Sequence, residues 1–303
     1  MIDLRSDTVT KPTDKMKQAM LKAKLGDDVF EEDPTVAELE NRLAKMFGID
    51  AGLFCPSGTM TNQIALNIHL NPGDEVICSR ESHIYNYEGG GIAKNSGASV
   101  RLIDGESGLI TSQDVVENIN PDDVHYPVSK LVSLENTSNR GGGVCYSMKE
   151  MKEIAKVCEK NSLPLHLDGA RVFNAIIKNN ENPVEYGEVF NSISICLSKG
   201  LGAPLGSVLI GSENFIRKAR RVRKVFGGGM RQVGLVAAAG IYALDNHVER
   251  LKNDHLHAKM IGQALMKCTW INSVLPVETN IVVGYLNEDR DNNDFVELLK
   301  QKN

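Results

Sequence analysis

Two short apolar runs, each followed closely by a charged residue, constrain the fold of this chain most strongly. Residues 165–167 lead directly into Asp168, and residues 192–197 lead through Ser198 into Lys199. Runs of this length that are apolar almost throughout are typical of strands covered on both faces. The carboxyl ends of such strands form the edge of the sheet where ligands bind. The sequence therefore predicts that Asp168 and Lys199 reach that edge.

Helical and strand-like segments alternate along the chain. Asp33 and Pro34 have the residue types of an N-cap and a first helical position, and they predict a helix that stops at Gly48. A capping box at residues 147–150 predicts another. Strand-like runs occur at residues 75–78, 100–103, 130–134 and 164–167. This order predicts an α/β, three-layer fold with a mostly parallel sheet and helices on both faces.

The pattern changes after residue 246, and we expect three parts. These are an N-terminal arm (1–12), a large domain (13–246) and a small C-terminal α+β domain (247–303). The small domain is expected to contain an amphipathic segment at 248–267 and a strand at 280–284. Residues 294–303 start a helical pattern that stops, so this domain looks truncated or dependent on the large one.

Charge and composition exclude several classes of protein. A net charge of −5 leaves no broad basic face for nucleic acid, and no apolar run is long enough to cross a bilayer. The first residues do not resemble a signal peptide. Six scattered cysteines without a CxxC pair favour buried free thiols in the cytoplasm over disulfides or a metal site. We therefore expect a cytoplasmic protein with no nucleic-acid or membrane partner.

Lys199 and Asp168 together suggest a cofactor. A strand that delivers a lysine into a glycine-rich turn, after a strand that delivers an aspartate, is how enzymes using pyridoxal 5'-phosphate (PLP) place a Schiff-base nitrogen and the partner of the pyridine nitrogen. Burial would favour the neutral amine of Lys199. Alternatively, Lys199 is a surface charge and Asp168 caps the next helix. Arg171 could bind a carboxylate or the ring oxygen, or lie at the surface.

Two segments could bind a phosphate group. The turn that contains Gly58 and Thr59 follows a strand-like run and opens a helix, whose free N–H groups favour an anion. Plain helix capping explains this turn equally well. Residues 220–231 include Lys224 and Arg231 and the only basic cluster of the chain, beside three glycines. Phosphate binding and a solvated helix end are both possible there.

Two histidines are candidates for proton transfer. His83 follows the strand that ends near Ser79, which puts it at the carboxyl edge of the sheet. An imidazole there could stack on a ring or move a proton near neutral pH, although a loop histidine is more often solvated. His125 has a similar loop context.

Taken together, these residues resemble the threonine aldolase family of PLP-dependent enzymes, which has the aspartate aminotransferase-like fold (type I). Several dispersed matches in the same order are more specific than any one motif. They lie at residues 3–10, 26–30, 32–35, 56–59, 135–137, 166–171, 198–204 and 227–232.

The resemblance implies a role for each candidate in cofactor binding. Lys199 would hold PLP covalently and Asp168 would pair with its pyridine nitrogen. His83 would stack on the ring, while Gly58 and Thr59 would hold the phosphate.

It also implies shared active sites. Lys224 and Arg231 would reach the phosphate of a neighbouring subunit, so that a dimer is the smallest active unit and a homotetramer is expected. Ser6 and Arg171 would hold the carboxylate of an amino-acid substrate.

The rest of the implied substrate site contains aromatic and imidazole side chains. His83 and His125 would serve the β-hydroxyl, directly or through water, beside Tyr87 and Phe30. Phe30 stands where many members have tyrosine, which removes one hydroxyl. The family usually continues beyond Asn303 with an arginine for the substrate carboxylate, and this sequence has no equivalent.

The implied reaction is retro-aldol cleavage of L-threonine or L-allo-threonine to glycine and acetaldehyde. Such an enzyme is a carbon–carbon lyase, an aldehyde-lyase of threonine catabolism and glycine biosynthesis. Two alternatives stay open: a related lyase or hydroxymethyltransferase of the same fold, and a relative that binds PLP but turns over poorly without the C-terminal arginine.

Overall fold

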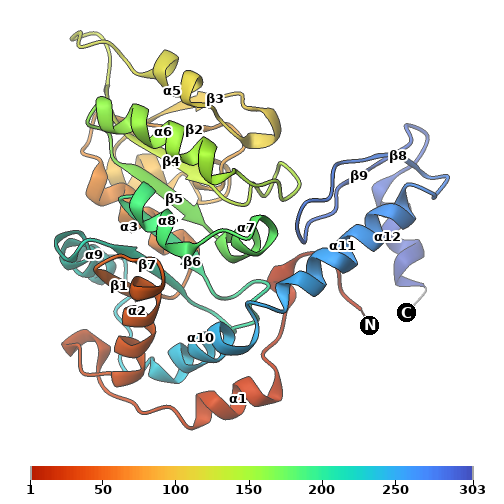
Figure 1. The fold of residues 1–303 in the computed structure, drawn as a ribbon, viewed down its shortest axis with the longest axis horizontal. Helices are drawn as coiled ribbons and strands as arrows, with labels where there is room; N and C mark the ends of the chain where they lie inside the picture. Colours follow the sequence, from red (N-terminus) through yellow and green to blue (C-terminus); the bar gives the residue numbers. More distant parts are fainter. Residues whose placement is uncertain (1, 302–303) are drawn as a thin grey trace.

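A seven-stranded sheet forms the centre of the computed structural model, which describes residues 2–301 (Figure 1). The strand order is β1-β7-β6-β5-β4-β2-β3. Strand β7 runs antiparallel to both of its neighbours, and the other pairs are parallel. The predicted mostly parallel sheet is confirmed. The strands are β1 (Ala51–Cys55), β2 (Asp74–Ser79), β3 (Ser99–Ile103), β4 (Val128–Glu135), β5 (Leu165–Gly169), β6 (Ser192–Cys196) and β7 (Ser207–Gly211).

Helices cover both faces of this sheet, because alternate side chains of each strand point to opposite faces. In β1, Phe54 joins the larger core cluster, whereas Leu53 and Cys55 join a second cluster beneath α3 and α9. Both faces are therefore buried, as the apolar runs predict. The helices of the large domain are α1 (Asp14–Leu21), α2 (Pro34–Met46), α3 (Gly58–His69), α4 (His83–Asn86), α5 (Ser112–Asn118), α6 (Met148–Lys160), α7 (Val172–Asn179), α8 (Pro183–Val189), α9 (Glu213–Val225) and α10 (Gly234–Asn246).

Two helix starts agree with the sequence prediction. The Asp33 side chain accepts hydrogen bonds from the backbone N–H groups of Thr35 and Val36 at the start of α2. Ser147 and Glu150 form the capping box that opens α6. Each cap satisfies helix N–H groups that have no partner within the helix, which is worth about 1 kcal/mol.

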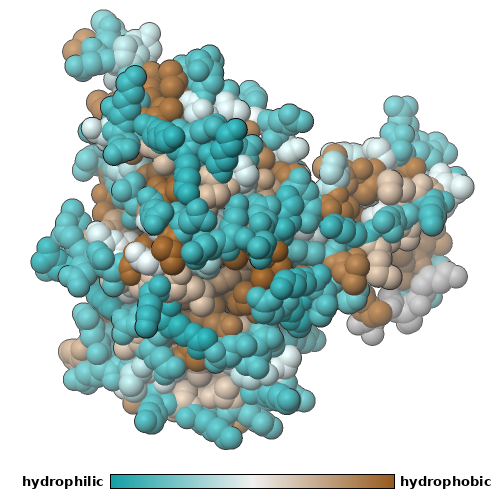
Figure 2. Space-filling model, viewed as in Figure 1, coloured by the Kyte–Doolittle hydropathy of each residue, from teal (hydrophilic) through white to brown (hydrophobic). Residues whose placement is uncertain are grey.

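The C-terminal segment forms a projecting lobe beside the N-terminal segment (Figure 1). It contains α11 (Leu251–Leu265), β8 (Ile271–Val274), β9 (Gly284–Leu286) and α12 (Asn292–Lys300). In space-filling view the lobe stands apart from the main body, with apolar residues showing on its surface (Figure 2). The domain boundaries stay a prediction.

The predicted strand at residues 280–284 is wrong, because β9 begins only at Gly284. The preceding residues instead contact Gly143 and the N-terminal segment through their side chains. Thr279 donates a hydrogen bond to the carbonyl of Gly143, and Asn280 donates one to the carboxylate of Asp7.

Burial agrees with the prediction for most of the cysteines, and all six are unpaired. The buried thiols are those of Cys55, Cys78, Cys158 and Cys196. Within residues 2–301, we find no helix with the length and apolar character needed to cross a membrane.

Candidate active site

A cavity of about 250 Å³ lies where β4, β5 and β6 end and α3 begins. This is the edge of the sheet at which α/β proteins bind ligands. The structure brings together here most of the residues that the sequence analysis selected, from segments far apart in the chain. The residues that line the cavity are Ser6, Thr8, Gly58, Thr59, Asn62, His83, Glu135, Asn139, Asp168, Ala170, Arg171, Cys196 and Lys199.

Lys199 enters the cavity three residues after the end of β6. Its backbone carbonyl accepts a hydrogen bond from the hydroxyl of Thr10, at 2.8 Å. Burial lowers the pKa of the Lys199 amine, but Cys196 and Asp168 raise it, and the net shift is upward. The neutral amine expected from burial alone is therefore corrected, because the neighbouring groups favour the ammonium. Lys199 must lose a proton before it can attack a carbonyl.

Asp168 is buried at the carboxyl end of β5, and both of its oxygens accept hydrogen bonds. Oδ2 lies 2.9 Å from Nδ2 of Asn62, and Oδ1 lies 3.1 Å from the backbone nitrogen of Ala170. The cap residue of α7 is Arg171, and no side chain caps that helix. The alternative that Asp168 serves as its N-cap is therefore wrong.

His83 is held on two sides by buried carboxylates. Its backbone N–H donates to Glu135, at 2.7 Å, and its Nδ1 lies 3.0 Å from Oε1 of Glu88. The hydrogen bond to Glu88 raises the pKa of His83, although burial opposes this. The ring of Tyr87 lies beside the imidazole, with 5.6 Å between ring centroids. Tyr87 is half-exposed and does not line the cavity.

The sequence analysis missed Glu135 as a chemical group. It ends β4 directly opposite Asp168 in the parallel pairing. Burial raises the pKa of Glu135 to about 7, and the charge of Asp168 adds to this effect. The signal that could have found it is the one that found Asp168: a carboxylate at the end of an apolar run. Asn62 and Glu88 were also missed, since a polar residue inside a helix or loop has no such signal.

Arg171 lines the cavity, but Asp7 already occupies two of its nitrogens. Nε lies 2.7 Å from Oδ2 of Asp7, and Nη2 lies 2.8 Å from Oδ1. Nη1 donates to Asn139, at 3.2 Å. The guanidinium is thus not a surface group, which corrects that reading, and Nη1 and Nη2 each keep one N–H for a carboxylate or other ligand. Asp7 gave no sequence signal as its partner, although Ser6 beside it reaches the cavity as expected.

The start of α3 forms one wall of the cavity. The Ser57 hydroxyl accepts from the backbone of Met60, and Gly58 and Thr59 are the first helical residues. A Cβ at Gly58 would lie 2.5 Å from the sulfur of Cys196, so the absence of a side chain keeps this wall open. A helix start with free N–H groups suits a phosphate.

This set of groups fits PLP. The cavity offers an amine (Lys199), a carboxylate (Asp168), an imidazole (His83) and the helix start. A metal ion is a poorer fit. His83, Glu88 and Asp168 place ligand-type atoms within 4.8 Å of one another, but these groups already hydrogen-bond to each other or to Asn62.

Four other residues that the sequence analysis selected lie away from this cavity in the structure of the chain. His125 precedes β4 and so lies at the opposite, amino end of that strand; its side chain is 83% exposed and pairs with Asp123. Its placement beside His83 within one chain is therefore corrected. Lys224 lies in the last turn of α9 and is exposed. Arg231 pairs with Asp27, and its guanidinium lies 5.6 Å from the exposed ring of Phe30.

Comparison with solved structures agrees with this fold. The threonine aldolase of Leishmania major has a TM-score of 0.83, with 97% of this chain and 86% of that chain covered. Its sequence is 23% identical, so the likeness concerns the fold alone.

Sequence comparisons establish the family. A family model described as beta-eliminating lyase matches residues 3–289. The low specificity L-threonine aldolase of Escherichia coli K12 is 42% identical over 290 residues, which cover 95% of this chain and 86% of that protein. Low-specificity L-threonine aldolase 1 of Arabidopsis thaliana is 42% identical over 286 residues, with 93% and 80% covered. The chain belongs to the threonine aldolase family of beta-eliminating lyases.

Proposed function

We propose that this chain is a carbon–carbon lyase that cleaves L-threonine and L-allo-threonine to glycine and acetaldehyde with PLP as cofactor. The observation that carries the proposal is the meeting of Lys199, Asp168 and His83 around one cavity beside the start of α3. The relatives named low-specificity L-threonine aldolase support the substrate class.

Each group of the cavity has a part in cofactor binding. When bound, PLP supplies an electron sink for cleavage of a bond to Cα. Lys199 holds it covalently after losing a proton. Asp168 is buried at the end of β5 and held in place by two hydrogen bonds, which suits its carboxyl group to pair with the ring nitrogen. The N–H groups of Gly58 and Thr59 hold the phosphate.

Proton transfer falls to His83 and Glu135. Glu88 binds Nδ1 of His83, so Nε2 is left to exchange a proton with the substrate hydroxyl. The pKa of Glu135, raised to about 7, suits a group that holds a proton near neutral pH. Ser6 and the remaining N–H groups of Arg171 orient the substrate carboxylate, with Tyr87 beside His83.

The active form in this proposal is a homotetramer in the cytoplasm, acting in threonine catabolism and glycine biosynthesis. Lys224 and Arg231 reach the phosphate of another subunit, since both are exposed and outside the cavity of their own chain. Phe30 lies beside this Arg231. His125 can serve a hydroxyl only in the site of another copy, because it lies at the opposite edge of its own sheet.

Replacing the lysine tests the proposal. Wild-type protein with PLP should show a Schiff-base absorption band and release acetaldehyde and glycine from threonine without tetrahydrofolate, which distinguishes it from a hydroxymethyltransferase. Lys199→Ala should lose both the band and the turnover. Lys156→Ala, at an exposed position of α6, should keep both. A missing band in the wild type, or one that survives in Lys199→Ala, contradicts the proposal.

A further inference from the structure

Asn62 of α3 connects the two buried carboxylates of the active site. Its Nδ2 lies 2.8 Å from Oε1 of Glu88 and 2.9 Å from Oδ2 of Asp168. Its Oδ1 lies 3.2 Å from Nε2 of His166, the second residue of β5. Asn62 is 2% exposed and His166 is fully buried. All three polar groups of the amide therefore face protein partners and not solvent.

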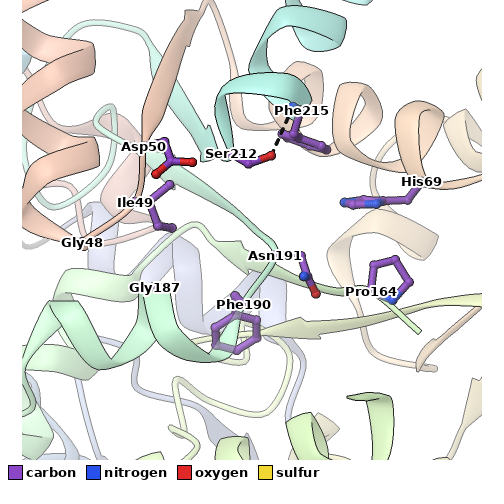
Figure 3. Close-up of a pocket in the computed structure, with 10 residues that line it drawn as sticks. All are labelled: Gly48, Ile49, Asp50, His69, Pro164, Gly187, Phe190, Asn191, Ser212 and Phe215. Atoms are coloured by element: carbon purple, nitrogen blue, oxygen red, sulfur yellow. Dashed lines mark hydrogen bonds between the residues drawn. The ribbon is translucent and has the colours of Figure 1, made fainter. Parts of the chain in front are cut away.

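The polar chain continues through the sheet to its other edge. Nδ1 of His166 lies 2.9 Å from the hydroxyl of Ser192, which lies 3.0 Å from Nε2 of His69. His69 ends α3 and borders a second cavity of about 370 Å³ (Figure 3). The figure shows its ring at the side of this cavity, across from the phenyl ring of Phe190.

The direction of every hydrogen bond in this chain follows from the carboxylates. Ionised carboxylates only accept, so both N–H groups of Asn62 donate and its oxygen must accept. His166 therefore carries its proton on Nε2, and its Nδ1 accepts from Ser192. Burial lowers the pKa of His166 to about 3 and that of His69 to about 4, so each imidazole is neutral with one N–H. His69 then donates to Ser192.

We propose that Asn62 is a positioning residue that divides its two N–H groups between Asp168 and Glu88, and that His166 keeps its amide from turning over. A half-turn of the amide would point its oxygen at two carboxylates and its NH₂ at the N–H of His166. The two contacts between the amide oxygen and the carboxylates would then be repulsive, and His166 would have to move its proton to Nδ1, so one orientation is strongly preferred. The catalytic consequence rests on the proposed function.

This arrangement gives each of two neighbouring buried carboxyl groups an N–H donor of its own. Without shared donors, buried carboxylates this close would retain a proton. Burial and the charge of Asp168 raise the pKa of Glu88, and hydrogen bonds from His83, Asn62 and Gln63 limit that rise without reversing it. Asn62 thus leaves Asp168 able to pair with a ring nitrogen and Glu88 able to orient His83. The other titratable groups around the two carboxylates are His83, Glu135, Arg171, Cys196 and Lys199.

Asn67 provides a matched control on the same helix. It is also an asparagine, but its Nδ2 donates to the carbonyl of Asn95. The experiment compares the pH titration of the visible absorption of PLP-loaded wild type, Asn62→Leu and Asn67→Leu. In Asn62→Leu, Asp168 and Glu88 lose charge-assisted donors, so their pKa values should rise. We therefore expect the pH midpoint of the absorption change to shift upward by about one pH unit or more. The acid limb of kcat/KM should shift equally. An Asn62 variant that titrates like Asn67→Leu overturns the proposal.

Further variants keep the test decisive if Asn62→Leu does not fold. Asn62→Asp keeps the shape but adds a negative charge and an acceptor, so its shift should exceed one pH unit as well. His166→Phe removes the donor that holds the amide and should shift the transition in the same direction. His166→Gln keeps an N–H donor and should lie closer to wild type. A phenylalanine variant that lies closer to wild type than the glutamine variant contradicts the locking role.

The cofactor-free chain separates this inference from the proposed function. Labelling with ¹⁵N-histidine locates the imidazole protons by NMR without PLP. In wild type, His166 should carry its proton on Nε2 alone from about pH 5 to pH 9, and Asn62→Leu should abolish this preference. A proton on Nδ1 of His166 overturns the network even in an active aldolase. A proton on Nε2, together with no PLP absorption band, supports the network and overturns the proposed function.

Discussion

Arg171 and Asp7 form a two-point ion pair between the active site and the N-terminal segment. Their side chains are 8% and 9% exposed. Asn280 of the C-terminal lobe donates to the same carboxylate, at 3.0 Å. Through this buried ion pair, the N-terminal segment and the C-terminal lobe both contact the group that positions Arg171 at the cavity.

Removal of Asp7 should therefore destabilise the protein and weaken substrate binding. Asp7→Ala leaves a buried guanidinium without its partner, which costs about 3 kcal/mol. Asp3→Ala is the control, because its partner Arg5 is 79% exposed and solvent screens that pair, so its loss should change stability much less. Denaturant unfolding and KM for threonine measure the two effects. Equal destabilisation by both variants contradicts the role of the buried pair.

This ion pair should also make the free energy of unfolding depend on pH in the acid range. Burial opposes ionisation of Asp7, but Arg171 and Asn280 outweigh it and lower its pKa. Its contribution is therefore complete above the ordinary aspartate range and disappears as the pH falls through the lowered pKa. The difference in unfolding free energy between wild type and Asp7→Ala should shrink in acid, and a difference that stays constant speaks against the pair.

Glu135 should make the free energy of unfolding depend on pH in the opposite direction to Asp7. Burial and the charge of Asp168 raise its folded-state pKa to about 7, so between its unfolded value and this pH the folded state binds the proton more tightly. Stability should then fall as the pH rises across this window, by roughly 3 kcal/mol in total. Glu135→Gln should lack this fall in denaturant titrations at several pH values. Parallel stability curves for the two proteins would show that Glu135 does not titrate there.

Gly58 should be required for a tight phosphate site. Gly58→Ala puts a Cβ against the sulfur of Cys196, so the helix start or the thiol must move. We expect PLP affinity to fall about tenfold, equivalent to about 1.4 kcal/mol. The double variant Gly58→Ala/Cys196→Ala removes the sulfur and should recover most of that affinity in a fluorescence titration. A double variant as weak as Gly58→Ala would place the cause elsewhere.

Active sites shared between subunits should permit complementation. Lys199→Ala and the double variant Lys224→Ala/Arg231→Ala should each be inactive alone. In a mixed dimer, one of the two sites regains both sets of residues, so co-expression should restore about a quarter of wild-type activity if pairing is random. If all three residues served the same chain's site, every mixed site would stay defective and no activity would return.

Local patterns in the sequence were sufficient for several elements and for the centre of the site. The caps of α2 and α6 involve residues within three positions of each other. Asp168 and Lys199 could be assigned to one edge because each follows a short apolar run, and the direction of a parallel strand determines which edge its end reaches. The same logic explains why His125, which precedes its strand, lies at the opposite edge.

The sequence by itself therefore determined the layered fold, the family, and the placing of Asp168 and Lys199 after strand ends. Only the tertiary structure decided that β7 runs antiparallel to its neighbours, that Arg171 pairs with Asp7, and that Asn62 stands between two carboxylates. These features depend on which distant elements become neighbours, and no periodicity of residue types records that. The physical reason is that a buried charge or amide must find its partners in space, wherever along the chain those partners occur.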